Sequence, residues 1–318
     1  MIKISKFGGS SVASAEQFKK VKAIVDADPD RKFIVVSAVG RRFDGDNKIT
    51  DLLLLVNAHI QYHVDCTSLL ADIEQRFVDI ADELGVTWPV AEKFETFAKN
   101  IKKHSPEYIV SRGEWFTSHI MAEYLGLKFV DAADVIVFHH DGTVDIERTA
   151  SRLKEVVVRE GAFVLPGFYG ATVDGSIKLF KRGGGDITGA IVARCINADL
   201  YENWTDVSGF LSADPRVVDD PRSIRRITFD EMRELSYMGA SVLQADTIDT
   251  ALKTLRSGRG ADLVMIDVSL PISRLITSLE EERIHVPVVA CGMIGSAQGW
   301  KEAPYVRCPA DIQTLASQ

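Results

Sequence analysis

The chain has 318 residues, enough for one large α/β domain or two smaller ones. Its net charge of -8 argues against a general nucleic-acid surface and against binding to an anionic membrane. No apolar run approaches the roughly 20 residues that a membrane span needs, and the N-terminus has no signal-peptide pattern. The four cysteines lack metal-like spacing, which favours reduced thiols in a cytoplasmic protein.

A glycine-rich stretch, KFGGSSVA at residues 6–13, follows a short apolar strand near the N-terminus. The two glycines let the backbone approach a ligand, and the two serines can cap a following helix whose free N–H groups favour an anion. The lysine adds a positive charge at the strand end. These features predict a phosphate-binding turn, although glycines alone would equally suit a plain strand–turn–helix junction. The residues concerned are Lys6, Gly8, Gly9, Ser10 and Ser11.

Unbroken apolar runs alternate with amphipathic helical patterns along the rest of the chain. The runs at 32–38 and 162–166 are typical of parallel strands buried on both faces. The pattern predicts an α/β fold, a three-layer αβα sandwich with a mostly parallel open sheet. Residues 40–47 are polar and predict a mobile loop, and Asp174-Gly175 predicts a hairpin turn. Further strands are expected at 129–132, 135–138 and 200–204, and helices at 18–26, 52–63, 108–124, 148–160, 190–195 and 228–238.

Four short motifs stand at the carboxyl ends of expected strands: KFGG, SAVG at 37–40, PGFYG at 166–170 and TDVSG at 205–209. Ligands of open α/β sheets bind beyond these ends, so the four loops are expected to converge on one site.

A second glycine-rich loop, KRGGGDIT at residues 181–188, precedes the helix expected at 190–195. Arg182 can bind a carboxylate through two parallel hydrogen bonds, and Asp186 lies where the helix begins. A flexible loop with an N-cap aspartate is the alternative, but three glycines between Arg and Asp favour ligand binding.

Several single polar residues have two possible roles each. Glu114 could bind a substrate ammonium group, but a salt bridge with a neighbouring Arg or Lys is favoured from sequence alone. Thr50 could contact a substrate, with helix capping favoured. Asp206, after Thr205 at a strand end, could contact a nucleotide and Arg216 its phosphates.

The seven histidines form no triad or metal set with the acidic residues. Transfer of phosphate to a carboxylate would need no general base, because that acceptor, with a pKa near 4, is already ionised at neutral pH.

In this order, the motifs resemble those of the aspartokinases, within the amino-acid kinase family. The resemblance covers residues 1–243 and extends through KITDLL at 48–53, SRGE at 111–114, NADLYENWTDVSGFLSADPR at 197–216 and ELSYMGASVL at 234–243.

The resemblance implies ATP-dependent phosphorylation of the L-aspartate side chain, the first step towards lysine, threonine and methionine. It implies that Lys6, near Gly8 and Gly9, stabilises the phosphate, with Asp186 as a further catalytic residue. Aspartate would be held by three residues: Thr50, Glu114 and Arg182. The nucleotide would be held by four others: Ser10, Thr205, Asp206 and Arg216. Mg²⁺ would be bound by phosphate oxygens and water, with no metal site made of protein ligands.

Some features depart from the family pattern. Gly185 replaces a usual serine, Leu211 stands where some members have an aromatic residue, and Gln244 replaces a histidine. The regulatory ACT domains that many members carry are not recognisable. The chain is therefore divided into a catalytic domain at 1–243 and an atypical βα segment at 244–318.

Residues 240–318 resemble a damaged response-regulator receiver, with Asp267 at the phosphoacceptor position. The acidic pair that would hold Mg²⁺ is missing, so a βα segment completing or abutting the kinase sheet is favoured. Two other functions stay open: a sister kinase acting on another carboxylate, and a non-catalytic sensor or scaffold. A homodimer is one assembly left open.

Overall fold

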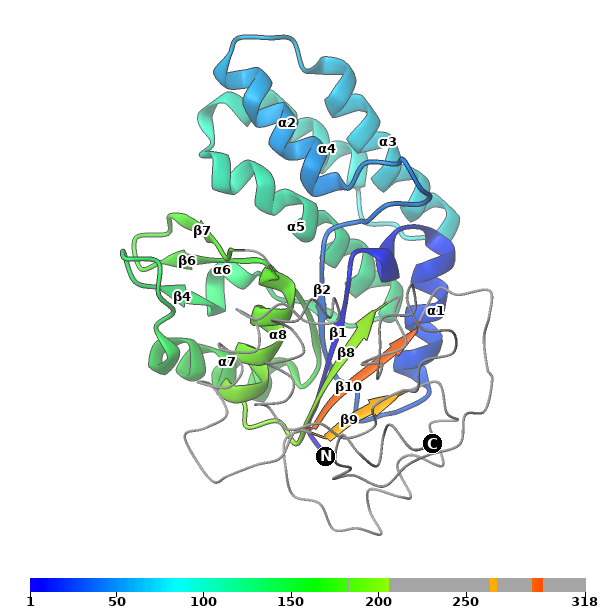
Figure 1. Ribbon diagram of the computed structural model, residues 1–318, viewed down its shortest axis with the longest axis vertical. Helices are drawn as coiled ribbons and strands as arrows, with labels where there is room; N and C mark the ends of the chain where they lie inside the picture. The colour runs from blue at the N-terminus through cyan, green and yellow to red at the C-terminus, as the bar shows by residue number, and fades with distance from the viewer. Residues whose placement is uncertain (182, 206–263, 268–287, 294–318) are drawn as a thin grey trace, which may run out of the picture.

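A seven-stranded sheet forms the centre of the protein in this computed structural model, which describes residues 1–181, 183–205, 264–267 and 288–293. The strand order is β3-β5-β2-β1-β8-β10-β9, and every neighbouring pair is parallel. Parallel strands need crossover connections, which the helices supply on both faces (Figure 1), so the predicted three-layer αβα sandwich is confirmed. The strands are β1 (Lys3–Phe7), β2 (Phe33–Val36), β3 (Lys128–Phe129), β5 (Phe163–Pro166), β8 (Leu200–Thr205), β9 (Val264–Asp267) and β10 (Val288–Met293).

The two faces of the sheet divide the core because successive strand residues point to opposite sides. On β2, Ile34 and Val36 join the cluster that includes α1 to α5, whereas Phe33 and Val35 join the cluster that includes α7 and α8. All four are buried, as the unbroken apolar run predicts. The helices are α1 (Ala15–Asp26), α2 (Ile49–Gln61), α3 (Thr67–Leu84), α4 (Val90–Asn100), α5 (Pro106–Leu125), α6 (Ala132–Val135), α7 (Ile146–Glu160) and α8 (Gly184–Cys195), with 3-10 helices η1 (Ser10–Val12) and η2 (Ile101–Lys103).

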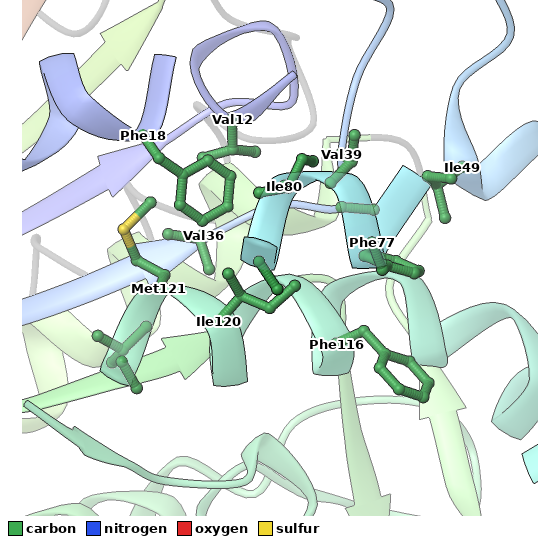
Figure 2. Close-up of a cluster of buried hydrophobic side chains, with 14 of the residues drawn as sticks. Val12, Phe18, Val36, Val39, Ile49, Phe77, Ile80, Phe116, Ile120 and Met121 are labelled. Carbon is green, nitrogen blue, oxygen red and sulfur yellow. The ribbon is translucent and has the colours of Figure 1, made fainter. Parts of the chain in front are cut away.

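The larger cluster joins the sheet to the helical layer above it in Figure 1. Figure 2 shows Phe77 and Ile80 of α3 among side chains from the sheet, α2 and α5, including Ile49 and Phe116. Each of these side chains is almost fully buried. The helices are therefore fixed on the sheet by apolar packing, at roughly 25 cal/mol for each Å² of apolar surface removed from water.

A small second sheet, β4-β6-β7, lies beside α6 and α7. Strands β6 and β7 form an antiparallel hairpin, and Gly175 adopts a φ of 86° at its turn, as the Asp-Gly pair predicts. Asp131 caps α6 by accepting a hydrogen bond from Ala133 N at 2.9 Å. Because α6 begins there, the strand expected at 129–132 ends early, as β3. The small sheet consists of β4 (Val137–Phe138), β6 (Tyr169–Thr172) and β7 (Ile177–Leu179).

The two C-terminal strands extend the main sheet. Backbone pairing joins β10 to β8 from Val288–Leu200 to Met293–Thr205, and β9 pairs with β10 on its other side. The interpretation favoured from sequence, a βα segment that completes or abuts the main sheet, stays a prediction, because only these two strands of the segment are described. The helix expected at 228–238 lies outside the described residues, as do most of residues 244–318.

No helix in the part of the chain that the structure describes is both long and apolar enough to cross a membrane.

Candidate functional site

Lys6 reaches from β1 to the beginning of α8. Its Nζ lies 2.5 Å from Oδ1 of Asp186, and the side chains are 9% and 16% exposed. Ser5, one residue earlier, points to the opposite face and donates a hydrogen bond to Glu202 at 2.7 Å. The strand alternation thus places Lys6 on the α8 face, where it joins the two glycine-rich loops.

The turn after β1 is held by backbone hydrogen bonds. Gly8 N donates to Trp204 O at 3.2 Å, and Ser11 N donates to Gly8 O at 3.0 Å to close η1. The prediction that Ser10 and Ser11 cap the following helix is wrong, because a separate 3-10 helix contains them. Ser14 instead caps α1, its side chain accepting a hydrogen bond from Gln17 N at 3.5 Å.

Gly9 and Gly40 touch through their backbones. Gly40 N donates to Gly9 O at 3.0 Å. A Cβ atom built on Gly40 would lie 2.4 Å from the carbonyl carbon of Gly9, closer than real Cβ contacts allow. Glycine at position 40 is therefore required for the loop after β2 to pack against the loop after β1.

The start of α8 meets two further loops. A Cβ on Gly185 would lie 2.7 Å from Ser37 Oγ, and a Cβ on Gly167 would lie 2.9 Å from Gly185 Cα. Phe168 N donates to Thr188 Oγ1 at 3.0 Å. Three of the four predicted loops therefore converge at one end of the sheet, and Thr205, the first residue of the fourth, ends the neighbouring β8.

Helix α8 begins earlier than residue 190, where the sequence places it. Gly183 adopts a φ of 76° as the N-cap, a conformation that glycine tolerates, and Gly184 to Asp186 form the first turn. The amide groups of this turn have no partner within the helix, so they and Lys6 favour a negative charge beside them.

Glu114 lies on α5 with 4% of its surface exposed. Burial raises its pKa to about 8, while hydrogen bonding to the backbone at Glu114 and Ala38 and the charge of Arg112 act in the opposite direction. Its Oε2 has no hydrogen-bond partner, and no Lys or Arg among the described residues pairs with it. The salt bridge favoured from sequence is therefore not formed within the described residues.

Gly113 explains why Glu114 can approach the loop after β2. A Cβ at position 113 would lie 2.9 Å from Ala38 Cβ and 3.3 Å from Ile49 Cγ2, so α5 packs closely there. Glu114 follows Gly113 on α5, and its carboxylate accepts a hydrogen bond from the backbone of Ala38.

Thr50 lies in the first turn of α2 and is half-buried. The prediction that it caps the helix is wrong, because Lys48 occupies the N-cap position and makes no side-chain hydrogen bond there. Helix α2 is instead attached through Ile49 N, which donates to Val39 O at 3.1 Å. The Thr50 hydroxyl makes no hydrogen bond with the described part of the chain.

Three predicted site residues lie outside the described residues: Arg182, Asp206 and Arg216. Of Thr205 only the backbone is described. Asp186, Lys6, Gly8, Gly9 and Ser10 lie together at the end of β1 and the start of α8, whereas Thr50 and Glu114 lie on α2 and α5.

Sequence reasoning missed two buried arginines. Arg112 on α5 is 5% exposed, and its guanidinium carbon lies 4.2 Å from the centre of the Tyr108 ring. Arg76 on α3 is 7% exposed and bonds to two backbone carbonyls. Arg76 occupies the same helix face as Ile73, Phe77 and Ile80, a charged residue within an apolar stripe, and this pattern could have revealed it.

The arrangement combines a buried cation and free helix amides at one end with a buried carboxylate at the other. Such a site suits a ligand that carries both a phosphate and an ammonium group. Among the described residues, no group of His, Cys, Asp and Glu could hold a metal ion, so Mg²⁺ fits here only if the ligand phosphates supply most of its oxygen ligands.

A parallel sheet with glycine-rich anion-binding turns at its carboxyl edge is the architecture of many phosphate-handling α/β proteins. The model of the Amino acid kinase family matches residues 1–258, and the chain belongs to that family. This match extends beyond residue 243, the last residue of the motif resemblance described above. A second model, that of 2-keto-3-deoxy-galactonokinase, matches residues 238–318. The receiver resemblance of this stretch finds no support in these matches.

The relatives are aspartokinases. Aspartokinase 3 of Bacillus subtilis (strain 168) is 35% identical over 267 residues, covering 79% of this chain and 59% of that protein. The crystal structure of Clostridium acetobutylicum aspartate kinase has a TM-score of 0.75 and 45% identity, covering 80% of this chain and 58% of that one. E. coli aspartokinase III in complex with aspartate and ADP has a TM-score of 0.68 and 27% identity, with coverages of 80% and 60%. The chain thus spans about three fifths of the length of these relatives.

Proposed function

We propose that the protein phosphorylates the side-chain carboxylate of L-aspartate with ATP, forming 4-phospho-L-aspartate, the first step towards lysine, threonine and methionine. The observation that carries this proposal is the Lys6–Asp186 ion pair at the meeting point of the two glycine-rich loops. Similarity to aspartokinases, one of them solved with aspartate and ADP, supports aspartate and ATP as the substrates.

Aspartate would bind between α5, α2 and α8. The buried carboxylate of Glu114 would bind the ammonium group, and the hydroxyl of Thr50 would donate a hydrogen bond. Arg182 would bind a carboxylate through its two parallel donors. No Lys or Arg of the described residues forms an ion pair with Glu114, which supports the first of these roles, because a buried carboxylate is stabilised by an opposite charge.

Phosphoryl transfer would take place beside Lys6. An oxygen of the aspartate carboxylate forms a bond to the γ-phosphorus while the bond from that phosphorus to the leaving ADP oxygen breaks. The carboxylate is already ionised, so no base is required. Lys6, held by Asp186, would neutralise the transferring phosphate. Backbone amides of the turn that contains Gly8 and Gly9, and of the first turn of α8, would be further hydrogen-bond donors.

The nucleotide would lie at the end of β8, with Ser10, Thr205, Asp206 and Arg216 as its contacts. Mg²⁺ would be held by phosphate oxygens and water, where it would offset the negative charge of the phosphates. We place the catalytic domain at residues 1–243 and the C-terminal strands in the segment 244–318. A homodimer stays a prediction.

A coupled assay of ADP release tests the proposal with three acceptors: L-aspartate, L-glutamate and N-acetyl-L-glutamate. Turnover with L-aspartate alone is the expected result. Turnover with another acceptor and none with aspartate would identify a sister kinase.

A second candidate is a protein that binds these ligands without turnover. The change of matching family at residues 238–318 favours it, because that stretch follows β8, where the nucleotide would bind. Calorimetry that detects ATP and aspartate binding, combined with no ADP release, would support this candidate.

A further inference from the structure

Arg76 binds the main chain at both ends of one loop. Its Nη1 donates to Asn47 O and its Nη2 donates to Gly40 O, each at 2.6 Å. Its closest carboxylate is that of Asp46, at 3.5 Å, and its Nε has no partner. The guanidinium therefore serves chiefly as a donor to two backbone carbonyls that are separated by the loop 40–47.

Both ends of this loop lead directly into the candidate site. At one end, Gly40 packs against Gly9, with its amide donating to Gly9 O at 3.0 Å. At the other end, Asn47 precedes Lys48, the N-cap of α2, so Thr50 follows three residues after the bound carbonyl. Together with the hydrogen bond from Ile49 N to Val39 O, this side chain thus holds the spacing between the glycine turn and Thr50.

Helix α3 gives Arg76 a rigid base. Phe77 and Ile80 of the same helix are buried in one cluster with Val39 and Ile49, which Figure 2 shows. Val39 and Ile49 flank the loop that Arg76 binds. The arginine cannot move independently of the core, so its two hydrogen bonds hold the loop ends in place.

A second arginine stabilises the same loop in a different way. Arg42 donates to Asp46 from Nε at 2.9 Å and from Nη2 at 3.1 Å, and its side chain is 44% exposed. This pair lies within the loop and does not reach either end. Arg42 therefore offers a matched control for Arg76.

A buried arginine with one unpartnered donor is an expensive way to fill a core position, since an apolar side chain of similar volume would avoid its desolvation. The position among Ile73, Phe77 and Ile80 would otherwise suit such a side chain. An apolar side chain could not make the two carbonyl contacts, which offset the cost of burying the guanidinium.

We infer that Arg76 is a positioning residue for the acceptor substrate: it holds the glycine turn at Gly9 and Gly40 and the hydroxyl of Thr50 at the separation that the acceptor requires. The inference rests on the proposed function, because it assumes that Thr50 contacts aspartate. It does not make Arg76 a contact of either substrate.

The test compares the full chain with Arg76→Lys, Arg76→Gln and the control Arg42→Lys. Lysine keeps the charge but cannot bind both carbonyls in the same geometry, and glutamine keeps one donor group. We expect the KM for aspartate to rise about tenfold in both Arg76 variants, the effect of losing one charge-assisted hydrogen bond. The KM for ATP and the value of kcat should stay within about threefold, and Arg42→Lys should resemble the wild type.

Amide hydrogen exchange provides a second readout that needs no turnover. The Arg76 variants should exchange at least about tenfold faster at residues 40–50, with no change at residues 146–160 of α7. If the wild type phosphorylates aspartate and the Arg76 variants have a normal KM for aspartate, the inference is overturned while the proposed function stands. If the wild type does not use aspartate, the proposed function fails, and unchanged exchange at residues 40–50 would overturn the inference as well.

Discussion

The two ends of the candidate site balance their charges in opposite ways. At one end, Lys6 and Asp186 form an ion pair on β1 and α8. At the other end, Glu114 is buried on α5 with no ion-pair partner in the part of the chain that the structure describes, and burial raises its pKa to about 8. Both ends use a glycine for close packing: Gly185 leaves room for the Ser37 side chain, and Gly113 leaves room for the side chains of Ala38 and Ile49.

This difference shows what each end can select. A paired lysine keeps its charge and position until a stronger anion, such as a phosphate, competes with the carboxylate for it. An unpaired buried carboxylate instead gains most from a ligand that brings its own positive charge. The first end therefore suits the transferring phosphate, and the second suits the ammonium group of an amino acid.

The largest expected effect comes from Lys6→Met. Removing the cation should lower kcat about 10³-fold, because charge neutralisation is the main catalytic contribution to phosphoryl transfer. Steady-state kinetics at saturating ATP and aspartate would measure it. Lys3→Met is the matched control, since Lys3 lies on the same strand and pairs with Asp28 on the other face. An equal loss of kcat in both variants would show that general destabilisation, rather than charge at the site, is responsible.

The second prediction concerns stability against pH. Because the pKa of Glu114 is raised in the folded chain, the folded state binds more protons between about pH 4.5 and 8, and stability falls as pH rises through this window. From pH 5.5 to 8.5 this one group should remove roughly 3 kcal/mol from the free energy of unfolding. Urea unfolding at the two pH values, with and without Glu114→Gln, measures the contribution.

A Glu114→Gln variant that retained the full pH dependence would contradict the assignment of this slope to Glu114. The two ends of the site would then no longer differ in the way described above, with a paired charge at Lys6 and an unpaired carboxylate at Glu114.

The third prediction is the binding effect of the same substitution. Glu114→Gln should raise the KM for aspartate about 30-fold and leave the KM for ATP nearly unchanged. The reason is that the substitution removes the carboxylate that would bind the ammonium group of aspartate. The KM of the wild type should also fall between pH 6.5 and 8.5, as Glu114 ionises, and this fall should vanish in the variant. An equal rise in both KM values would place Glu114 outside the acceptor subsite.

The smallest predicted effect belongs to Thr50. Thr50→Val should raise the KM for aspartate about fivefold, since a neutral hydrogen bond contributes about 1 kcal/mol. Thr50→Ser keeps the hydroxyl and should behave like the wild type. Identical kinetics in the wild type and both variants would show that Thr50 does not contact aspartate.

The parts that could be predicted from sequence are those with local signals. The apolar run around Ile34 and Val36 predicted a strand buried on both faces, and the glycines at 8, 9 and 183–185 predicted turns that meet at the sheet edge.

The features that sequence did not indicate depend on side-chain contacts, one of them between residues far apart in the chain. The loop 40–47 was expected to be mobile, which stays a prediction, and no local signal indicates that Arg76, on α3, binds a carbonyl at each of its ends. A salt bridge was favoured for Glu114 because sequence cannot show that the neighbouring Arg112 is directed towards aromatic rings. The caps expected at Ser11 and Thr50 were displaced because neighbouring residues, Ser14 and Lys48, occupy the helix ends.

The most direct test of the central claim uses aspartate labelled with ¹⁸O in its side-chain carboxylate. ³¹P NMR of the product formed with ATP and Mg²⁺ should show the isotope shift of an ¹⁸O atom bonded to phosphorus, and Lys6→Met should abolish the signal on the same timescale. A phosphorylated product without the shift would contradict attack by the carboxylate. An undiminished signal from Lys6→Met would contradict the role of Lys6 in neutralising the transferring phosphate.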